Sequence, residues 1–150
     1  MVEENGTNGK PVRLESLTYT LSMTVNMPHA SRKPPERTEE MIAVTKAYDL
    51  VREMTRRVGK FPRDFKFLLG DRILGNVYGV LDLLIEAKYT KNKSSILDRA
   101  NLRLEQVRFQ LRLAHDERLM STHQYEVAAR LVDEVGRLVG GWRRSRGGST

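Results

Sequence analysis

The segment 121–142 carries one apolar stripe at helical spacing, and this stripe narrows the choice of fold more than any other feature of the chain. Its members recur at intervals of three and four residues: Tyr125, Ala128, Val132, Val135, Val139 and Trp142. Ser121 and Gln124 have the spacing of a capping box, which fixes where the helix begins. A helix with one apolar stripe cannot bury it alone, so the rest of the chain must supply packing partners.

The end of this segment is rich in glycine and then in arginine. Gly140 and Gly141 weaken the helix, and Trp142 closes its stripe. We expect the arginine-rich residues after Trp142 to fray, and we assign 146–150 as a basic, flexible tail. The packed domain should therefore end at about residue 145.

Two earlier segments carry a single apolar stripe of the same kind. The first covers 38–58, with Thr38 as a potential cap and Gly59 as a stop. The second begins at a cap formed by Ser94 or Ser95 and reaches about residue 117. Its stripe consists of Leu97, Ala100, Leu104, Val107, Leu111 and Ala114.

A further helical segment, 63–91, is apolar on more than one face. Such a helix is buried on two sides, so in a small bundle part of its surface should meet another subunit. The candidates for this oligomer interface are Phe65, Leu69, Leu74 and Leu81. Gly75 and Gly79 lie four residues apart on one face, where they permit close backbone approach at a helix crossing.

Four long helices joined by short connections predict an all-α fold, an up-down-up-down antiparallel four-helix bundle over residues 38–145. Residues 1–37 form a separate N-terminal extension, with glycine and proline near its beginning and proline alone near its end. Within it, apolar and hydroxyl side chains alternate over 17–25 as in a strand. A lone strand has no ladder partner, so the extension is disordered, pairs with a copy of itself in an assembly, or adds to a partner's sheet.

The charge of the chain favours an anionic partner. The formal net charge is +7, and residues 38–150 hold 21 basic against 15 acidic residues. This excess suits binding to nucleic acid, and the alternative is that it serves only solubility. Within the segment 94–117, four arginines lie outside the apolar stripe, and Arg suits bidentate phosphate contacts and stacking on bases. The alternative is a solvated helix face, partly neutralised by Asp98 and Glu105.

The sequence contains no recognisable pattern for catalysis or metal binding. It has no cysteine, no Glu-x-x-His pair and no phosphate-binding glycine loop. His115, Asp116 and Glu117 are consecutive, so on a helix they point in different directions. We therefore expect no enzymatic activity, no cofactor and no metal. Since it also has no apolar run that could span a bilayer and no cleavable signal pattern, we expect a cytoplasmic protein without a membrane partner.

Three ordered segments, 107–113, 120–124 and 134–142, resemble a known family. The last of them reads Glu-Val-Gly-Arg-Leu-Val-Gly-Gly-Trp and is the most specific. Over about 41–146 the chain resembles the accessory variability determinant protein (Avd) of diversity-generating retroelements. That family belongs with four-helix-bundle proteins related to those encoded in intervening sequences of 23S ribosomal RNA genes.

The resemblance implies a function that the spacing of residues does not. Members of the family are barrel-shaped homopentamers that bind the retroelement's reverse transcriptase and nucleic acid. They are not catalysts, and they support the mutagenic copying of a template RNA into cDNA, termed mutagenic retrohoming. By position, Arg108 and Arg112 match basic residues of the family's third helix, while Arg137 and Trp142 match the basic residue and the tryptophan of its terminal motif.

The candidate residues for binding nucleic acid or the polymerase combine these matches with the other arginines outside the stripes. They are Arg99, Arg103, Arg108, Arg112, Arg137, Arg143 and Arg144. The partners implied are the reverse transcriptase, template RNA and cDNA, and further copies of this chain in a homopentamer. Two other functions stay open. One is a general nucleic-acid-binding bundle of the intervening-sequence type, and the other is a purely structural oligomeric adaptor.

Overall fold

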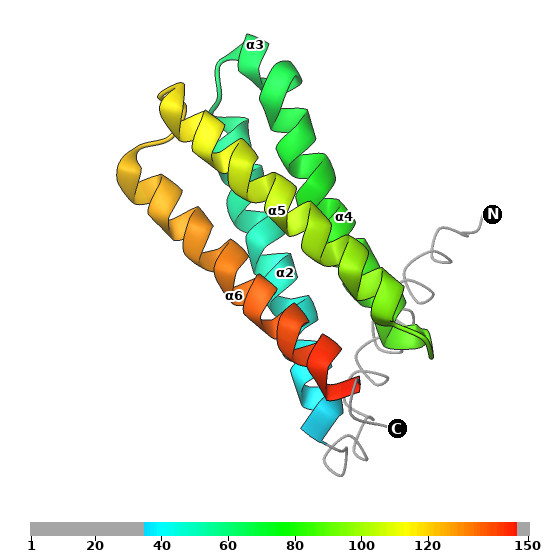
Figure 1. The fold of residues 1–150 in the computed structure, drawn as a ribbon. Coiled ribbons are helices and arrows are strands. Elements are labelled where there is room, and N and C mark those ends of the chain that lie inside the picture. The colour runs from blue at the N-terminus through cyan, green and yellow to red at the C-terminus, as the bar shows by residue number, and fades with distance from the viewer. Residues whose placement is uncertain (1–34, 147–150) are drawn as a thin grey trace, which may run out of the picture. The chain divides into compact units, whose positions relative to one another are not determined.

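The computed structural model of the chain describes residues 35–146, and this part is all-α, without a strand (Figure 1). Its long helices are α2 (Pro35–Gly59), α4 (Asp71–Tyr89), α5 (Ser94–Asp116) and α6 (Thr122–Arg146). The short helix α3 (Arg63–Phe65) and a π-helical turn, η2 (Lys66–Gly70), lead into α4. Each long helix runs antiparallel to the next and α6 packs beside α2, which confirms the predicted four-helix bundle.

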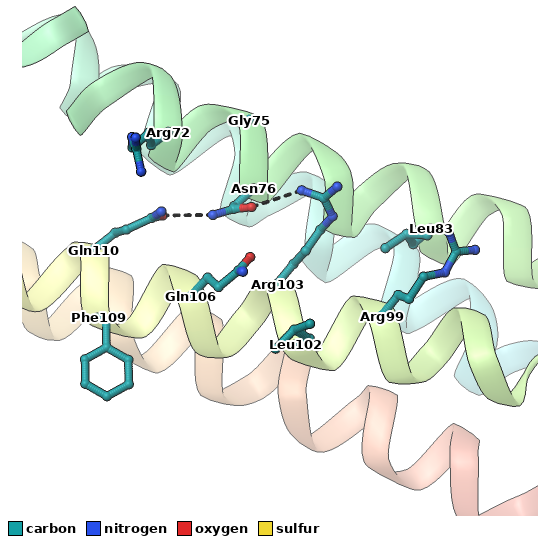
Figure 2. A pocket seen from close by; sticks show the side chains of 10 residues that line it. All are labelled: Arg72, Gly75, Asn76, Leu83, Arg99, Leu102, Arg103, Gln106, Phe109 and Gln110. Carbon is teal, nitrogen blue, oxygen red and sulfur yellow. Dashed lines mark hydrogen bonds between the residues drawn. The ribbon is translucent and has the colours of Figure 1, made fainter. Parts of the chain in front are cut away.

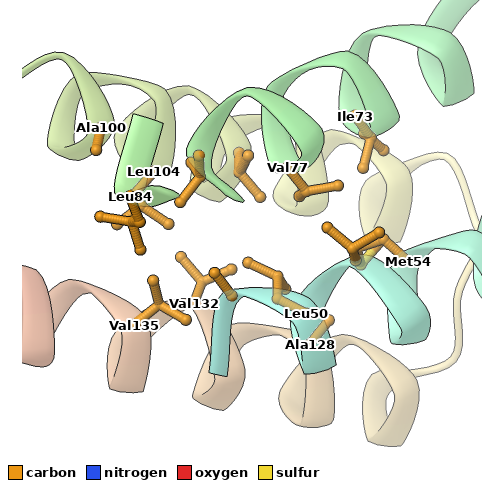
Figure 3. Packing of buried hydrophobic residues seen from close by; sticks show 14 of the residues in the cluster. Leu50, Met54, Ile73, Val77, Leu84, Ala100, Leu104, Ala128, Val132 and Val135 are labelled. Atoms are coloured by element: carbon orange, nitrogen blue, oxygen red, sulfur yellow. The ribbon is translucent and has the colours of Figure 1, made fainter. Parts of the chain in front are cut away.

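The core lies between the inner stripes of the four long helices, where side chains from all of them meet (Figure 3). The predicted stripe of α5 is buried throughout, and that of α6 is buried from Ala128 to Trp142. Only Tyr125, at the start of the α6 stripe, is partly exposed. Each buried Leu, Ile, Val or Met contributes about 1.5–3 kcal/mol, so these stripes supply the main stabilisation of the bundle.

The beginning of α2 differs from the prediction. The helix starts at Pro35, so Thr38 lies inside its first turn and is not the cap. Proline suits a first helical turn because its missing N–H has no intrahelical partner to lose. Glu40, which follows within this helix, is buried and pairs with Lys93 across the bundle, with 3.0 Å between Nζ and Oε1.

The predicted helix over 63–91 is interrupted by the π-helical turn and ends at Tyr89. At Gly70, the last residue of that turn, a Cβ atom would come within 2.6 Å of Val58 Cγ1 in α2. The close approach between α2 and the start of α4 therefore occurs at Gly70. Gly75 has open space around the position of a Cβ, so its predicted role at a helix crossing is wrong.

The connections on either side of α5 use different capping devices. Neither Ser94 nor Ser95 caps its start, because Lys93 occupies the cap position and bonds Glu40 through its side chain. At its end, Arg118 adopts φ 59°, while the backbone N–H groups of Arg118 and Leu119 bond carbonyls within the last turn at 2.9 Å and 2.8 Å. This is a Schellman motif, in which glycine is the usual left-handed residue.

The beginning of α6 is as predicted, and its end is not. The Ser121 N–H bonds Gln124 Oε1 at 3.0 Å and the Gln124 N–H bonds Ser121 Oγ at 3.1 Å, which confirms the capping box. The helix continues through Gly140 and Gly141 to Arg146, so the residues just after Trp142 are helical and not frayed. The strand pattern of the N-terminal extension and residues 147–150 lie outside the described part of the chain. No helix between residues 35 and 146 is long and apolar enough to cross a membrane.

Candidate nucleic-acid and protein interface

Four of the seven predicted binding arginines pair with carboxylates of the bundle itself. The pairs are Arg99–Glu86 at 3.5 Å, Arg108–Asp133 at 3.1 Å, Arg112–Asp116 at 3.9 Å and Arg143–Asp98 at 3.0 Å. All of these side chains are a third or more exposed, so solvent screens the pairs and each stabilises the fold by about 1 kcal/mol or less. Their positive charge is therefore partly neutralised by the protein's own surface.

Arg103 lies differently, in a groove between α4 and α5 with a volume of about 890 Å³. Its Nη1 donates to Asn76 Oδ1 at 3.0 Å, and Asn76 Nδ2 donates to Gln110 Oε1 at 3.2 Å (Figure 2). Gly79 makes room for this arginine, because a Cβ there would lie 2.9 Å from three atoms of its side chain. Arg103 is thus held along α4 by a neutral partner and keeps its full positive charge.

An apolar surface lies beside this groove, and it was not predicted from the sequence. It consists of Leu68 in the π-helical turn and of Leu102, Phe109 and Leu113 in α5, all exposed, and Leu68 and Leu113 line one hollow. Phe67, next to Leu68 in the chain, is exposed as well. Phe109 is 71% exposed and points away from α4 (Figure 2). The signal was present in the sequence, since residues 102, 109 and 113 form a second stripe on α5 at intervals of seven and four. Clustered aromatic and aliphatic side chains beside arginines are typical of protein–protein interfaces.

The predicted oligomer-interface residues are less exposed than this surface. Leu69 is buried in the core because the π-helical turn directs it inward, so we remove it from the candidate interface. Phe65, Leu74 and Leu81 are half-buried and pack against the core. Phe65 also lines a hollow with Leu68, so it adjoins the exposed apolar surface.

Two predicted binding arginines lie on the outer part of α6. Arg137 and Arg144 are exposed, and neither forms an ion pair with a carboxylate in the described part of the chain. They are separated by two helical turns, since seven residues span about 10 Å along the axis. Both remain available to an anionic ligand or partner.

The comparisons with known proteins identify the family. The bAvd-like family model matches residues 41–146, which include almost all of the bundle. The chain belongs to the bAvd-like family. A structure from the S23 ribosomal protein family of Bacteroides thetaiotaomicron, described as a protein of unknown function, is similar with a TM-score of 0.66 and 14% identity. It covers 71% of this chain, and 98% of its own length is aligned, which shows a shared fold. No curated protein matches the chain.

Within this bAvd-like chain, two of the three segments that resemble the family contact each other. Arg108 of α5 lies against Gly136 of α6, with 2.9 Å between its Nη2 and the position of a Cβ on the glycine. Trp142, at the end of the third segment, is buried, and Lys93 Nζ lies 5.2 Å from its ring centroid. These segments therefore hold helices together. Arg108 and Arg112 are only partly free to bind other molecules, whereas Arg137 is unpaired in the described part of the chain.

The cluster around His115 has a structural role in this bAvd-like bundle. The His115 ring stacks on Tyr125 with 4.9 Å between centroids, and its Nε2 lies 3.1 Å from Thr122 Oγ1. The ring therefore ties the end of α5 to the beginning of α6. Across residues 35–146, no group of three or more His, Asp or Glu side chains is arranged to hold a metal ion.

Proposed function

We propose that this chain is a non-catalytic accessory protein of a diversity-generating retroelement. It binds the element's reverse transcriptase together with template RNA and cDNA in the cytoplasm, and so supports mutagenic retrohoming. The observation that carries the proposal is the match of the bAvd-like family over residues 41–146. The chain contributes binding surfaces and no reacting group.

The surface formed by Leu68, Leu102, Phe109 and Leu113 supports a protein partner for this role. Exposed aromatic rings gain free energy when another protein covers them, and aromatic residues dominate binding at interfaces. Arg99 and Arg103 adjoin the surface and would set the orientation of an acidic partner. Further copies of this chain would cover other apolar positions of α4 in a homopentamer.

Co-purification tests the proposal. The chain is co-expressed with a reverse transcriptase of a diversity-generating retroelement, and the amount of polymerase retained is measured for the parent and for Phe109→Ser. We expect the variant to retain at least tenfold less polymerase, since a single central aromatic side chain can carry 2 kcal/mol or more, about a thirtyfold change in affinity. Tyr89→Ser is the matched control, because Tyr89 is an aromatic residue at the end of α4 that is at least as exposed as Phe109.

Three outcomes separate the possible functions. Loss of the polymerase in Phe109→Ser but not in Tyr89→Ser supports the accessory role. If the parent binds RNA but retains no polymerase, the chain is a general nucleic-acid-binding bundle of the intervening-sequence type. If it binds neither, the structural adaptor is correct, and sedimentation velocity then shows whether it assembles with itself.

A further inference from the structure

A second groove lies on the opposite side of α4, against α2, and it joins aromatic rings with arginines. It has a volume of about 340 Å³ and is lined by Tyr48, Val51, Arg52, Thr55, Arg56, Tyr78 and Leu81. Two of these residues are tyrosines on different helices, and their side chains are 53% and 48% exposed. Among the described residues that line it there are two arginines and no carboxylate.

The arginines of this groove carry charge that the bundle does not neutralise. Within the described side chains, Arg52 and Arg56 form no ion pair, in contrast to the paired arginines of α5. The nearby Glu53 is already bonded to Arg57, with 2.6 Å between Oε1 and Nε. Arg52 lies two turns before the end of α2, where the helix dipole gives it no stabilisation. The charge of Arg52 therefore has no evident role in folding, whereas Arg56, in the last turn of α2, also interacts favourably with the helix dipole.

The tyrosines are placed to receive flat ligands. The Arg52 guanidinium lies over the Tyr48 ring at 6.0 Å from its centroid, which orders the ring, and more than half of the side chain stays open to solvent. Tyr78 stands across the same groove on α4. Val51 and Leu81 line the groove with them. Val51 is buried and Leu81 is half-buried against the core, so the walls belong to the folded bundle.

We propose that this groove binds a single-stranded polynucleotide, with bases stacked on Tyr48 and Tyr78 and phosphates bound by Arg52 and Arg56. Sites of this kind combine aromatic platforms with a basic track, because every base has a π-face and every nucleotide has a charge. Arg52 and Arg56 are one turn apart, about 6 Å along α2, so both can reach one short stretch of backbone. A duplex keeps its bases stacked on one another, so it cannot use the tyrosines.

The inference deepens the proposed function, because template RNA and cDNA are the single strands that the accessory protein would meet. It also stands apart from the surface near Phe109, which lies on the other side of α4. One face would then hold the polymerase, and the other would hold its nucleic acid.

Fluorescence anisotropy of the full chain tests the groove, using labelled 12-nucleotide oligo(U) RNA, oligo(dT) DNA of equal length and a duplex of the same length. The double variant Tyr48→Leu with Tyr78→Leu keeps the apolar bulk and removes both rings. We expect it to bind either single strand at least tenfold more weakly, since stacking typically contributes roughly fivefold to a hundredfold per base. Tyr89→Leu, an exposed tyrosine outside the groove, should bind as the parent does.

The salt dependence separates the arginines from the tyrosines. Arg52→Gln with Arg56→Gln should lower the slope of log affinity against log salt by about 1.4 for single strands, because each lost phosphate contact removes about 0.7. The tyrosine variant should leave that slope unchanged. If RNA binds more tightly, the groove binds the template RNA, and if DNA binds more tightly, it binds the cDNA. Either result supports the proposal.

Several results would overturn the inference. They are parental binding by the tyrosine variant, an equal loss in Tyr89→Leu, or equally tight binding of the duplex. A changed sedimentation coefficient of the tyrosine variant would instead make this face a contact between copies of the chain, and the proposal would be wrong. Failure here is distinct from failure of the accessory role. In the first case the polymerase still co-purifies, and in the second the oligonucleotides still bind through the tyrosines.

Discussion

Arg108 Nη2 lies where a side chain on Gly136 would clash, at 2.9 Å from the position of its Cβ. The glycine therefore admits the guanidinium to the seam between α5 and α6. There the arginine donates from Nε to Asp133 Oδ1 at 3.1 Å and from Nη1 to Glu105. Gly136 is explained by the residue opposite it on the neighbouring helix and not by a turn.

The first prediction follows from this seam. Arg108→Ala together with Arg112→Ala should weaken binding to RNA or the reverse transcriptase and leave the fold intact. Each of the three lost ion pairs, Arg108 with Asp133 and Glu105 and Arg112 with Asp116, is partly exposed and should cost about 1 kcal/mol of unfolding free energy or less. Thermal melts check the predicted stability, and binding titrations check the predicted loss of binding. In Arg112→Ala alone stability should be unchanged, and a large loss there would show that this exposed pair is structural.

The second prediction contrasts two glycines of α4. Gly75→Ala should stabilise the bundle by about 1 kcal/mol, because its surroundings are open and alanine is the better helix former. Gly79→Ala should change the unfolding free energy little. The new Cβ displaces Arg103 and breaks its hydrogen bond to Asn76, and this loss of about 1 kcal/mol offsets the gain in helix propensity.

A double-mutant cycle measured by chemical denaturation tests that reason. In the background of Arg103→Ala, the substitution Gly79→Ala should regain the full gain of about 1 kcal/mol. If Gly79→Ala stays neutral there, the arginine is not what limits it.

The third prediction concerns the left-handed residue after α5. Arg118→Gly should stabilise the bundle by about 0.5–1 kcal/mol. Arginine incurs a steric cost at φ 59° that glycine does not incur, and this cost exceeds the entropy that glycine adds to the unfolded chain. Arg118→Ala removes the same charge but retains the strain, so it should bring no gain. Equal stabilisation by both variants in thermal melts would trace the effect to the charge and not to the backbone.

The local parts of the fold were predictable because they depend on residues close together in the sequence. The stripes of α5 and α6 follow from spacing alone, and the capping box joins Ser121 to a residue three positions later. The π-helical turn was not predictable in this way. Its last residue, Gly70, lies close to Val58 of another helix, and the sequence does not show that contact.

The candidate interface was harder to predict, for the same reason. Arg99 and Arg143 have acidic partners that lie on other helices, so their neutralisation depends on the register between helices. The charge excess was visible in the sequence. The sequence could not show that most α5 arginines pair with carboxylates, whereas Arg52 and Arg56 form no ion pair with the described residues. Only the packed bundle brings Tyr48 and Tyr78 to one groove.

The last prediction concerns Trp142, which joins the end of α6 to the start of α5. Trp142→Ala should cost roughly 3–5 kcal/mol of unfolding free energy, because the ring is buried and lies against the Lys93 ammonium at 5.2 Å. Arg143→Ala is the matched control, since its pair with Asp98 is about half exposed and its loss should cost less than about 1 kcal/mol. Trp142→Phe should fall between them, because it keeps an apolar ring in the core. Chemical denaturation of all three variants decides the matter, and equal losses for Trp142→Ala and Arg143→Ala would mean that the ion pair, and not the ring, holds this end of the bundle.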